Sequence, residues 1–122
     1  MSTRAQIRFA TRETGQSFNE HPDKIHAQFY KHCDGYPEGL GVDIANSLID
    51  RESLRSSWEI EELQTQHGDL DFIYYVWQKY DESTWISIFE MMEYGDHEGE
   101  CIFVGRPEKL IGKYKLNTNE DG

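Results

Sequence analysis

The chain has 122 residues, of which 37% are apolar and 13% aromatic, and this composition predicts one folded domain rather than a disordered chain. Its 23 acidic residues exceed its 12 Lys and Arg by 11, which argues against direct binding to nucleic acid or to anionic membranes. Two cysteines, no apolar signal segment and no membrane-spanning run predict a cytoplasmic protein with free thiols; a single Cys33–Cys101 bridge is the alternative.

Two alternating segments stand near the N-terminus. In residues 3–10, Ala5, Ile7 and Phe9 alternate with polar side chains, which predicts a half-buried strand. Residues 11–24 are polar and typical of a connection. Residues 25–32 alternate again, so we expect a second strand antiparallel to the first.

Two helices are expected in the middle of the chain. After a Gly- and Pro-rich turn, apolar residues recur between Leu40 and Ile49 with helical spacing and predict an amphipathic helix. Ser56 and Glu59 then match a capping box, so we expect a second helix to start there and to end at Gly68.

The last third is rich in strands. Residues 70–79 are apolar on both faces and predict a central strand, and residues 84–92 return as its hairpin partner. Residues 101–104 form one more short strand, and Pro107 opens a short helical segment. Residues 117–122 are expected to be a disordered tail.

These elements predict an α+β fold, a single antiparallel sheet of about five strands with two to three helices packed on it. Residues 1–122 form a single domain in this interpretation, without a linker or an internal repeat. The two apolar faces of the central strand leave open whether helices cover both sides of the sheet or a second copy of the chain covers one, as in a homodimer.

Charge is distributed very unevenly along the chain. The segment from Ser56 to Cys101 holds twelve acidic residues and one basic residue, Lys79, and therefore has a net charge of −11, whereas the remaining residues are neutral in sum. We expect acidic side chains of this segment to share a binding face: Glu59, Glu61, Glu62, Asp69, Glu90, Glu93, Asp96 and Glu98. The alternatives are a face that only keeps the protein in solution, or general acidity of a salt-adapted organism.

A second candidate site is the turn from His32 to Gly39, where His32, Asp34, Tyr36 and Glu38 can line a ligand site. The alternative interpretation is structural, because Asp34-Gly35 is typical of a turn and Glu38 suits a helix N-terminus. No bound metal or cofactor is expected, because these positions supply only two ligands with clear geometry.

Other groups offer weaker candidates. Cys101 with His97 and either His32 or Cys33 is the alternative zinc site. Adjacent residues on a strand point to opposite faces, so His32 is poorly placed to activate Cys33 as a nucleophile. Near the N-terminus three arginines can bind an anion, or pair with the acidic side chains, which we favour: Arg4, Arg8 and Arg12.

Two stretches carry a resemblance to a known group. Thr3-Arg4-Ala5-Gln6-Ile7 and the run from Phe29 to Gly39, with its His-x-Asp-Gly-Tyr-Pro-Glu-Gly pattern, resemble short proteins of bacteriophages and bacterial mobile elements. The resemblance covers the N-terminal third and supplies no catalytic residues. Small acidic phage proteins of this kind are similar to anti-defence inhibitors, including anti-CRISPR proteins, some of which mimic the charge of DNA.

The resemblance and the charge together lead to the expected function. We expect a non-enzymatic protein that docks its acidic face on a basic, nucleic-acid-binding surface of a host protein, with exposed aromatic residues such as Trp58 or Tyr94 as anchors. One alternative is a protein that binds or sequesters a small ligand at the His32–Gly39 turn. A third is a metal-dependent hydrolase built on His32, Asp34, His97 and Cys101.

Overall fold

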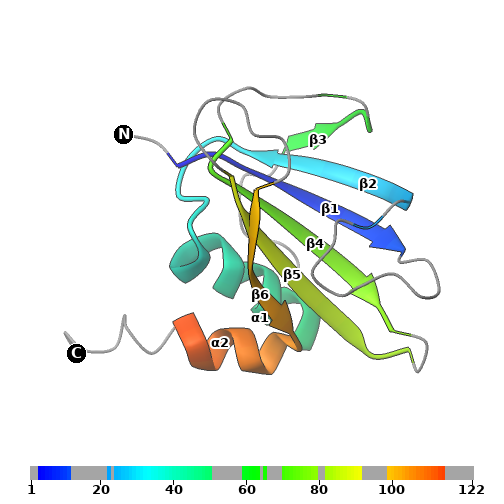
Figure 1. The fold of residues 1–122 in the computed structure, drawn as a ribbon, viewed down its shortest axis with the longest axis vertical. Helices are drawn as coiled ribbons and strands as arrows, with labels where there is room; N and C mark the ends of the chain where they lie inside the picture. Colours follow the sequence, from blue (N-terminus) through cyan, green and yellow to red (C-terminus); the bar gives the residue numbers. More distant parts are fainter. Residues whose placement is uncertain are drawn as a thin grey trace.

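The computed structural model describes residues 3–11, 22, 24–50, 59–63, 65, 70–79, 82–91 and 99–114. The strands within these ranges are β1 (Ala5–Thr11), β2 (Lys24–Lys31), β3 (Glu59–Glu61), β4 (Phe72–Gln78), β5 (Thr84–Glu90) and β6 (Glu100–Gly105). The helical elements are the π-helical turn η1 (Pro37–Gly41), α1 (Val42–Asp50) and α2 (Pro107–Tyr114). These elements make an α+β fold, as the sequence predicts (Figure 1).

The six strands form one mixed sheet in the order β3-β2-β1-β4-β5-β6. Neighbouring strands run antiparallel except β1 and β4, which pair in parallel from Ala5 opposite Phe72 to Ala10 opposite Trp77. The expected sheet was wholly antiparallel with about five strands. After β2 the chain forms η1 and α1 and adds β3 at the outer edge of β2. It then crosses to the other side of β1, where β4 pairs with β1 in parallel. Hairpin-length connections in the sequence carry no information about such a long-range pair.

Most strands lie where their sequence patterns predict them. β1 and β2 form the expected antiparallel pair, and β4 and β5 form the expected hairpin. β4 is an inner strand whose residues Ile73 to Trp77 are all buried, in agreement with its two apolar faces. β6 covers the expected short strand and extends it by one residue at each end, from Glu100 to Gly105.

The helices agree with the sequence at two places and differ at one. η1 and α1 occupy the region predicted as the first helix, and Pro107 is the first residue of α2. The predicted second helix is wrong at Glu59–Glu61, because these residues form β3 and pair with Tyr30, Phe29 and Gln28 of β2. Among the described residues, no helix is long and apolar enough to cross a membrane.

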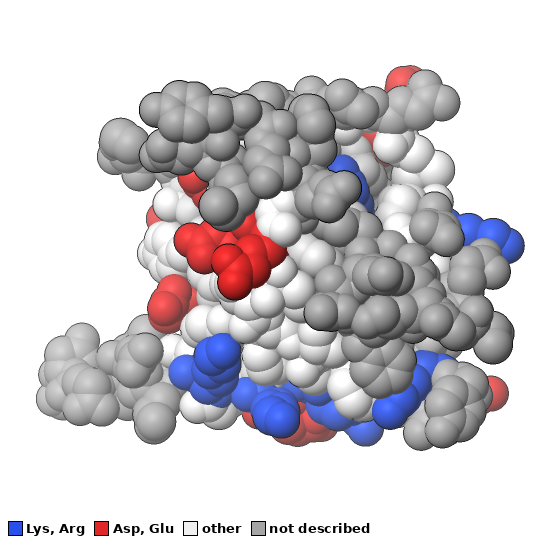
Figure 2. Space-filling view, viewed as in Figure 1, with Lys and Arg blue, Asp and Glu red and all other residues white. Residues whose placement is uncertain are grey.

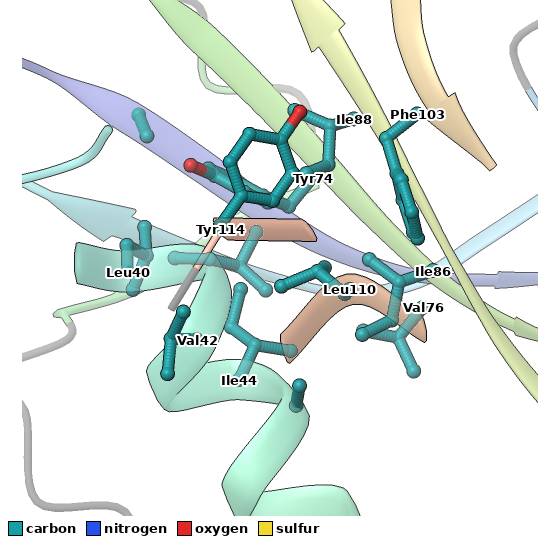
Figure 3. Close-up of a cluster of buried hydrophobic side chains, with 13 residues drawn as sticks. Leu40, Val42, Ile44, Tyr74, Val76, Ile86, Ile88, Phe103, Leu110 and Tyr114 are labelled. Atoms are coloured by element: carbon teal, nitrogen blue, oxygen red, sulfur yellow. The ribbon is translucent and has the colours of Figure 1, made fainter. Parts of the chain in front are cut away.

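The main core lies between the sheet and the two helices, which pack against each other on one side of it (Figure 1). Ile7, Tyr74, Val76, Ile86 and Ile88 of the sheet contribute to this core. The helical side chains that meet them are Leu40, Val42, Ile44, Ala45, Leu110 and Tyr114 (Figure 3). Leu110 and Ile44 are almost fully buried, so α1 and α2 have their apolar stripes turned to the sheet.

A second apolar cluster lies on the opposite face of the sheet. Its buried members are Ala10, Ile73, Tyr75, Trp77 and Phe89. Tyr75 and Phe89 meet edge to face with ring centroids 5.5 Å apart. Leu70, which precedes β4, packs against this cluster as well.

Candidate functional site

The acidic residues of β3 lie at one edge of the sheet. Glu59, Glu62 and the apolar Ile60 between them are exposed, whereas Glu61 is partly buried and bonded. Its Oε1 atom accepts hydrogen bonds from Nε2 of Gln6 at 3.1 Å and from Nε2 of Gln28 at 3.0 Å. The carboxylate of Glu61 therefore holds β3 against the sheet, and Glu59 and Glu62 are the members of this group that face solvent.

A second acidic group lies near the opposite edge of the sheet. Glu90 at the end of β5 stands directly opposite Glu100 at the start of β6, and both are exposed. Like charges in directly opposed positions destabilise a strand pair. Burial raises the pKa of the nearby Tyr114 hydroxyl, and the negative charges of Glu38 and Glu90 raise it further. Glu38 of η1 and Glu90 of β5 therefore both act on the Tyr114 hydroxyl.

The two acidic groups are well separated. β2, β1 and β4 lie between β3 and β5, so Glu61 and Glu90 are at least four strand spacings apart, or roughly 19 Å. The structure therefore joins Glu59, Glu61 and Glu62 into one group and places Glu90 elsewhere. The other four residues expected on this face lie outside the described residues: Asp69, Glu93, Asp96 and Glu98.

Charge is also segregated at the surface in the view of Figure 2. On this face the Lys and Arg side chains lie mainly along the lower rim, and a patch of Asp and Glu side chains lies above them. α2 and the residue before it contribute to the basic side, because Arg106, Lys109 and Lys113 are all exposed. An acidic partner surface and a basic partner surface would therefore meet different parts of the molecule.

The turn after β2 is held from inside the protein. Asp34 adopts a left-handed backbone conformation with φ of 60°, and the amide of Gly35 donates to the carbonyl of Thr3 at 2.9 Å. The hydroxyl of the buried Tyr74 donates to the carbonyl of Gly35 at 2.6 Å. A side chain at Gly35 would place its Cβ 2.8 Å from the Cβ of Ala5, so this close approach requires glycine. These contacts account for the turn without a ligand.

The side chains expected to line a ligand site mostly point to solvent. His32, Asp34 and Tyr36 are exposed, and Glu38 is partly buried in the first turn of η1. His32 and Asp34 have no hydrogen bond or ion pair with each other; the contact of His32 is Nδ1 to the Tyr30 hydroxyl at 3.5 Å. The structure thus brings these four residues onto one turn without a joint polar contact.

Both cysteines are free thiols. Cys33 is exposed next to His32, and Cys101 is partly buried, with its thiol 3.6 Å from the carbonyl oxygen of Phe103. The alternative Cys33–Cys101 bridge is therefore wrong for this structure. In the described part of the chain, no group of three His, Cys, Asp or Glu residues is arranged to hold a metal ion. His97, Trp58, Tyr94 and Arg12 lie outside that part.

A buried polar network on the face opposite the helices was not predicted. Nη1 of Arg8 donates to the Tyr75 hydroxyl at 2.8 Å, and Nη2 donates to Oε1 of Gln6 at 2.7 Å. Gln6, which is 0% exposed, connects this arginine to Glu61, and Gln28, which is 2% exposed, donates to the same carboxylate oxygen. Among the described residues, Arg8 therefore reaches the acidic side through Gln6 and not by the direct ion pair expected for it. The Nε atom of Arg8 is buried and has no hydrogen-bond partner among the described residues.

The sequence pattern of β1 does not predict this network. Gln6 and Arg8 alternate with the apolar residues of β1, and such positions normally face water. Burial of this second face depends on Ile73, Tyr75 and Phe89 in other strands, so the pattern of β1 alone gives no reason to expect that Gln6 and Arg8 are covered.

Comparison of the chain with protein-family models, curated proteins and solved structures finds no match.

Proposed function

We propose that this protein is a non-enzymatic binding protein of phage or mobile-element type. In this proposal its acidic residues dock on a basic, nucleic-acid-binding surface of a host protein, as an anti-CRISPR-like inhibitor does. The single observation that carries the proposal is the concentration of the whole net charge of −11 in the segment from Ser56 to Cys101. A charge concentrated in this way acts on partners through long-range attraction and costs folding energy through self-repulsion.

Exposure of the acidic side chains supports the proposal. Seven acidic residues of the segment are described, and all of them except Glu61 are exposed. Within the described chain, no ion pair neutralises the carboxylates of Glu59, Glu62, Glu82, Glu90 or Glu100. Unneutralised surface carboxylates accelerate encounter with a positive groove, and this acceleration weakens as the salt concentration rises.

The β3 group is the better candidate for the centre of the contact. Glu59 and Glu62 flank the exposed apolar side chain of Ile60, which is 82% exposed, whereas Glu90 and Glu100 stand opposite each other on neighbouring strands. Binding sites combine apolar anchors with a polar rim, and the β3 edge has both. We therefore expect the larger loss of binding from changes at β3.

The experiment is a pull-down from a bacterial host lysate with the tagged full chain, eluted with rising salt and analysed by mass spectrometry. The captured protein is then titrated with the wild type, with Glu59→Lys/Glu62→Lys and with Glu90→Lys/Glu100→Lys. The matched control is Asp43→Lys/Glu108→Lys, which makes the same change of net charge at exposed helix positions outside the segment. Circular dichroism checks that each variant is folded.

We expect capture of a nucleic-acid-binding protein that moderate salt releases. Glu59→Lys/Glu62→Lys should weaken binding of the captured protein at least tenfold. Asp43→Lys/Glu108→Lys should change the affinity less than about threefold, because net charge alone acts weakly across a surface screened by salt. Equal losses in all three double variants would mean that only net charge matters. Binding that neither salt nor charge reversal weakens would overturn the proposal.

A further inference from the structure

The edge of the sheet at β3 combines exposed apolar and acidic side chains. β3 is the terminal strand of the described sheet, and Ile60 at its centre is 82% exposed. Leu63, two residues beyond the end of β3, is 49% exposed. Proteins normally blunt an edge strand with charge and keep large apolar side chains away from it. Glu59 and Glu62 supply the charge here, so the exposed Ile60 needs another explanation.

The alternation of β3 gives the edge two different sides. Ile60 is paired with Phe29 of β2, which packs on the main core, so Ile60 lies on the side of the sheet that bears the helices. Glu59 and Glu61 point to the opposite side, where Glu61 is bonded to Gln28. A strand added next to β3 would therefore meet an apolar side chain on one side and the exposed carboxylate of Glu59 on the other.

Hydrogen bonds to Glu61 and to the residues after it order this edge of the sheet in the free protein. Gln28 Nε2 also donates to the carbonyl of Glu62 at 3.2 Å and to the carbonyl of Thr65 at 3.1 Å. Gln6 Nε2 donates to the same Thr65 carbonyl at 3.2 Å. These contacts fix the chain that follows Ile60 before a partner arrives, which lowers the entropy that binding must overcome.

Charge decides which partner fits. A second copy of the chain, paired antiparallel through β3 with Ile60 opposite Ile60, would place Glu59 opposite Glu61 of the other copy, and like charges in opposed positions repel. An extended segment in which Lys or Arg alternates with apolar residues has the complementary pattern. Its apolar residue meets Ile60, and the basic residue beside it meets the carboxylate of Glu59 on the other side of the sheet.

We propose that β3 binds such an alternating basic and apolar segment of a partner protein as an added strand. Main-chain hydrogen bonds to a sheet edge supply affinity in this mode of recognition, and the alternate side chains supply specificity. The inference rests on the proposed function and gives the docking contact a place, Glu59 to Leu63, and a form. The partner contributes an extended strand here, rather than only a positive groove.

The test uses the full chain labelled with ¹⁵N and the synthetic peptide Lys-Val-Lys-Val-Lys, with amide shifts recorded during titration at low salt. We expect the largest shifts at Glu59, Ile60 and Glu61. Ile60→Lys should weaken binding at least tenfold, because it adds a like charge and removes the apolar contact. Ile49→Lys is the matched control on α1, where the side chain is 41% exposed, and it should change affinity less than about threefold.

Two peptide variants examine the added-strand form. Lys-Pro-Lys-Pro-Lys keeps all three lysines and an apolar side chain at each alternate position but lacks two main-chain donors, so it should bind at least tenfold more weakly. Glu-Val-Glu-Val-Glu should not bind. Equal binding of the proline peptide, unchanged affinity of Ile60→Lys, or shifts centred on Glu90 and Glu100 would overturn the inference. The proposed function survives the last two outcomes if charge reversal still weakens the captured partner, so the two failures are distinguishable.

Discussion

The hydrogen bond from Tyr74 to the turn after β2 allows one prediction to be worked out in detail. Tyr74 is 0% exposed, and its hydroxyl donates to the carbonyl of the buried Gly35 at 2.6 Å. Tyr74→Phe keeps the ring in the core and removes only this donor. Leaving a buried acceptor without its donor costs about 1–3 kcal/mol of the free energy of unfolding.

Urea unfolding followed by circular dichroism measures the loss of free energy of unfolding, and thermal unfolding measures the change of Tm. For a chain of this size, 1 kcal/mol corresponds to roughly 4 °C in Tm, so we expect Tm to fall by about 4–12 °C. Tyr36→Phe is the matched control, because it removes the same hydroxyl from a side chain that is 41% exposed in the same turn. Its effect should stay within about 0.5 kcal/mol, since exposed positions tolerate such changes.

Two results would refute this reasoning. If Tyr74→Phe is as stable as the wild type, the contact with Gly35 contributes no net stability. If Tyr36→Phe is equally destabilising, the loss does not depend on burial of the hydroxyl. Hydrogen exchange adds a local check, because the amide of Gly35, which donates to Thr3, should exchange faster in Tyr74→Phe than in the control.

The remaining predictions concern alkaline pH and the buried amides. The pKa values of Tyr74 and Tyr114 are raised above 10.0, chiefly by burial, so above pH 10 the unfolded chain loses protons that the folded chain keeps. The free energy of unfolding should therefore fall as pH rises from 10, and less steeply in Tyr74→Phe; an unchanged slope would contradict this assignment. Gln28→Leu removes a donor to Glu61, and the amide hydrogen of Ile60 should then exchange with solvent at least tenfold faster. Unaltered exchange would show that the hydrogen bond between Gln28 and Glu61 does not hold β3 on the sheet.

Local patterns were sufficient for most of the strands. Alternation in β1 and β2 and the two apolar faces of β4 follow from side-chain period and burial, which a short window of sequence contains. Pro107 marks the start of α2 for an equally local reason, because its fixed φ suits the first helical turn. The α+β class follows from these elements together.

β3 shows where local patterns fail. Ser56 and Glu59 match a capping box, yet Glu59–Glu61 is a strand whose Glu61 is bonded to Gln6 and Gln28, residues 55 and 33 positions earlier in the chain. Such contacts override local preference because pairing and burial contribute more than a cap. The exposed Ile60, on which the inferred docking rests, becomes visible only once that pairing is known.

The sequence by itself determined the charge of this protein and its concentration between Ser56 and Cys101, because charge depends only on composition and order. The tertiary structure alone decided that β1 and β4 pair in parallel, and that Glu61 is bonded inward while Glu59 faces solvent. It also placed Glu90 on the far side of the central strands from β3. The physical reason is that strand order brings together residues that are distant in the chain, and neither charge nor periodicity encodes that order.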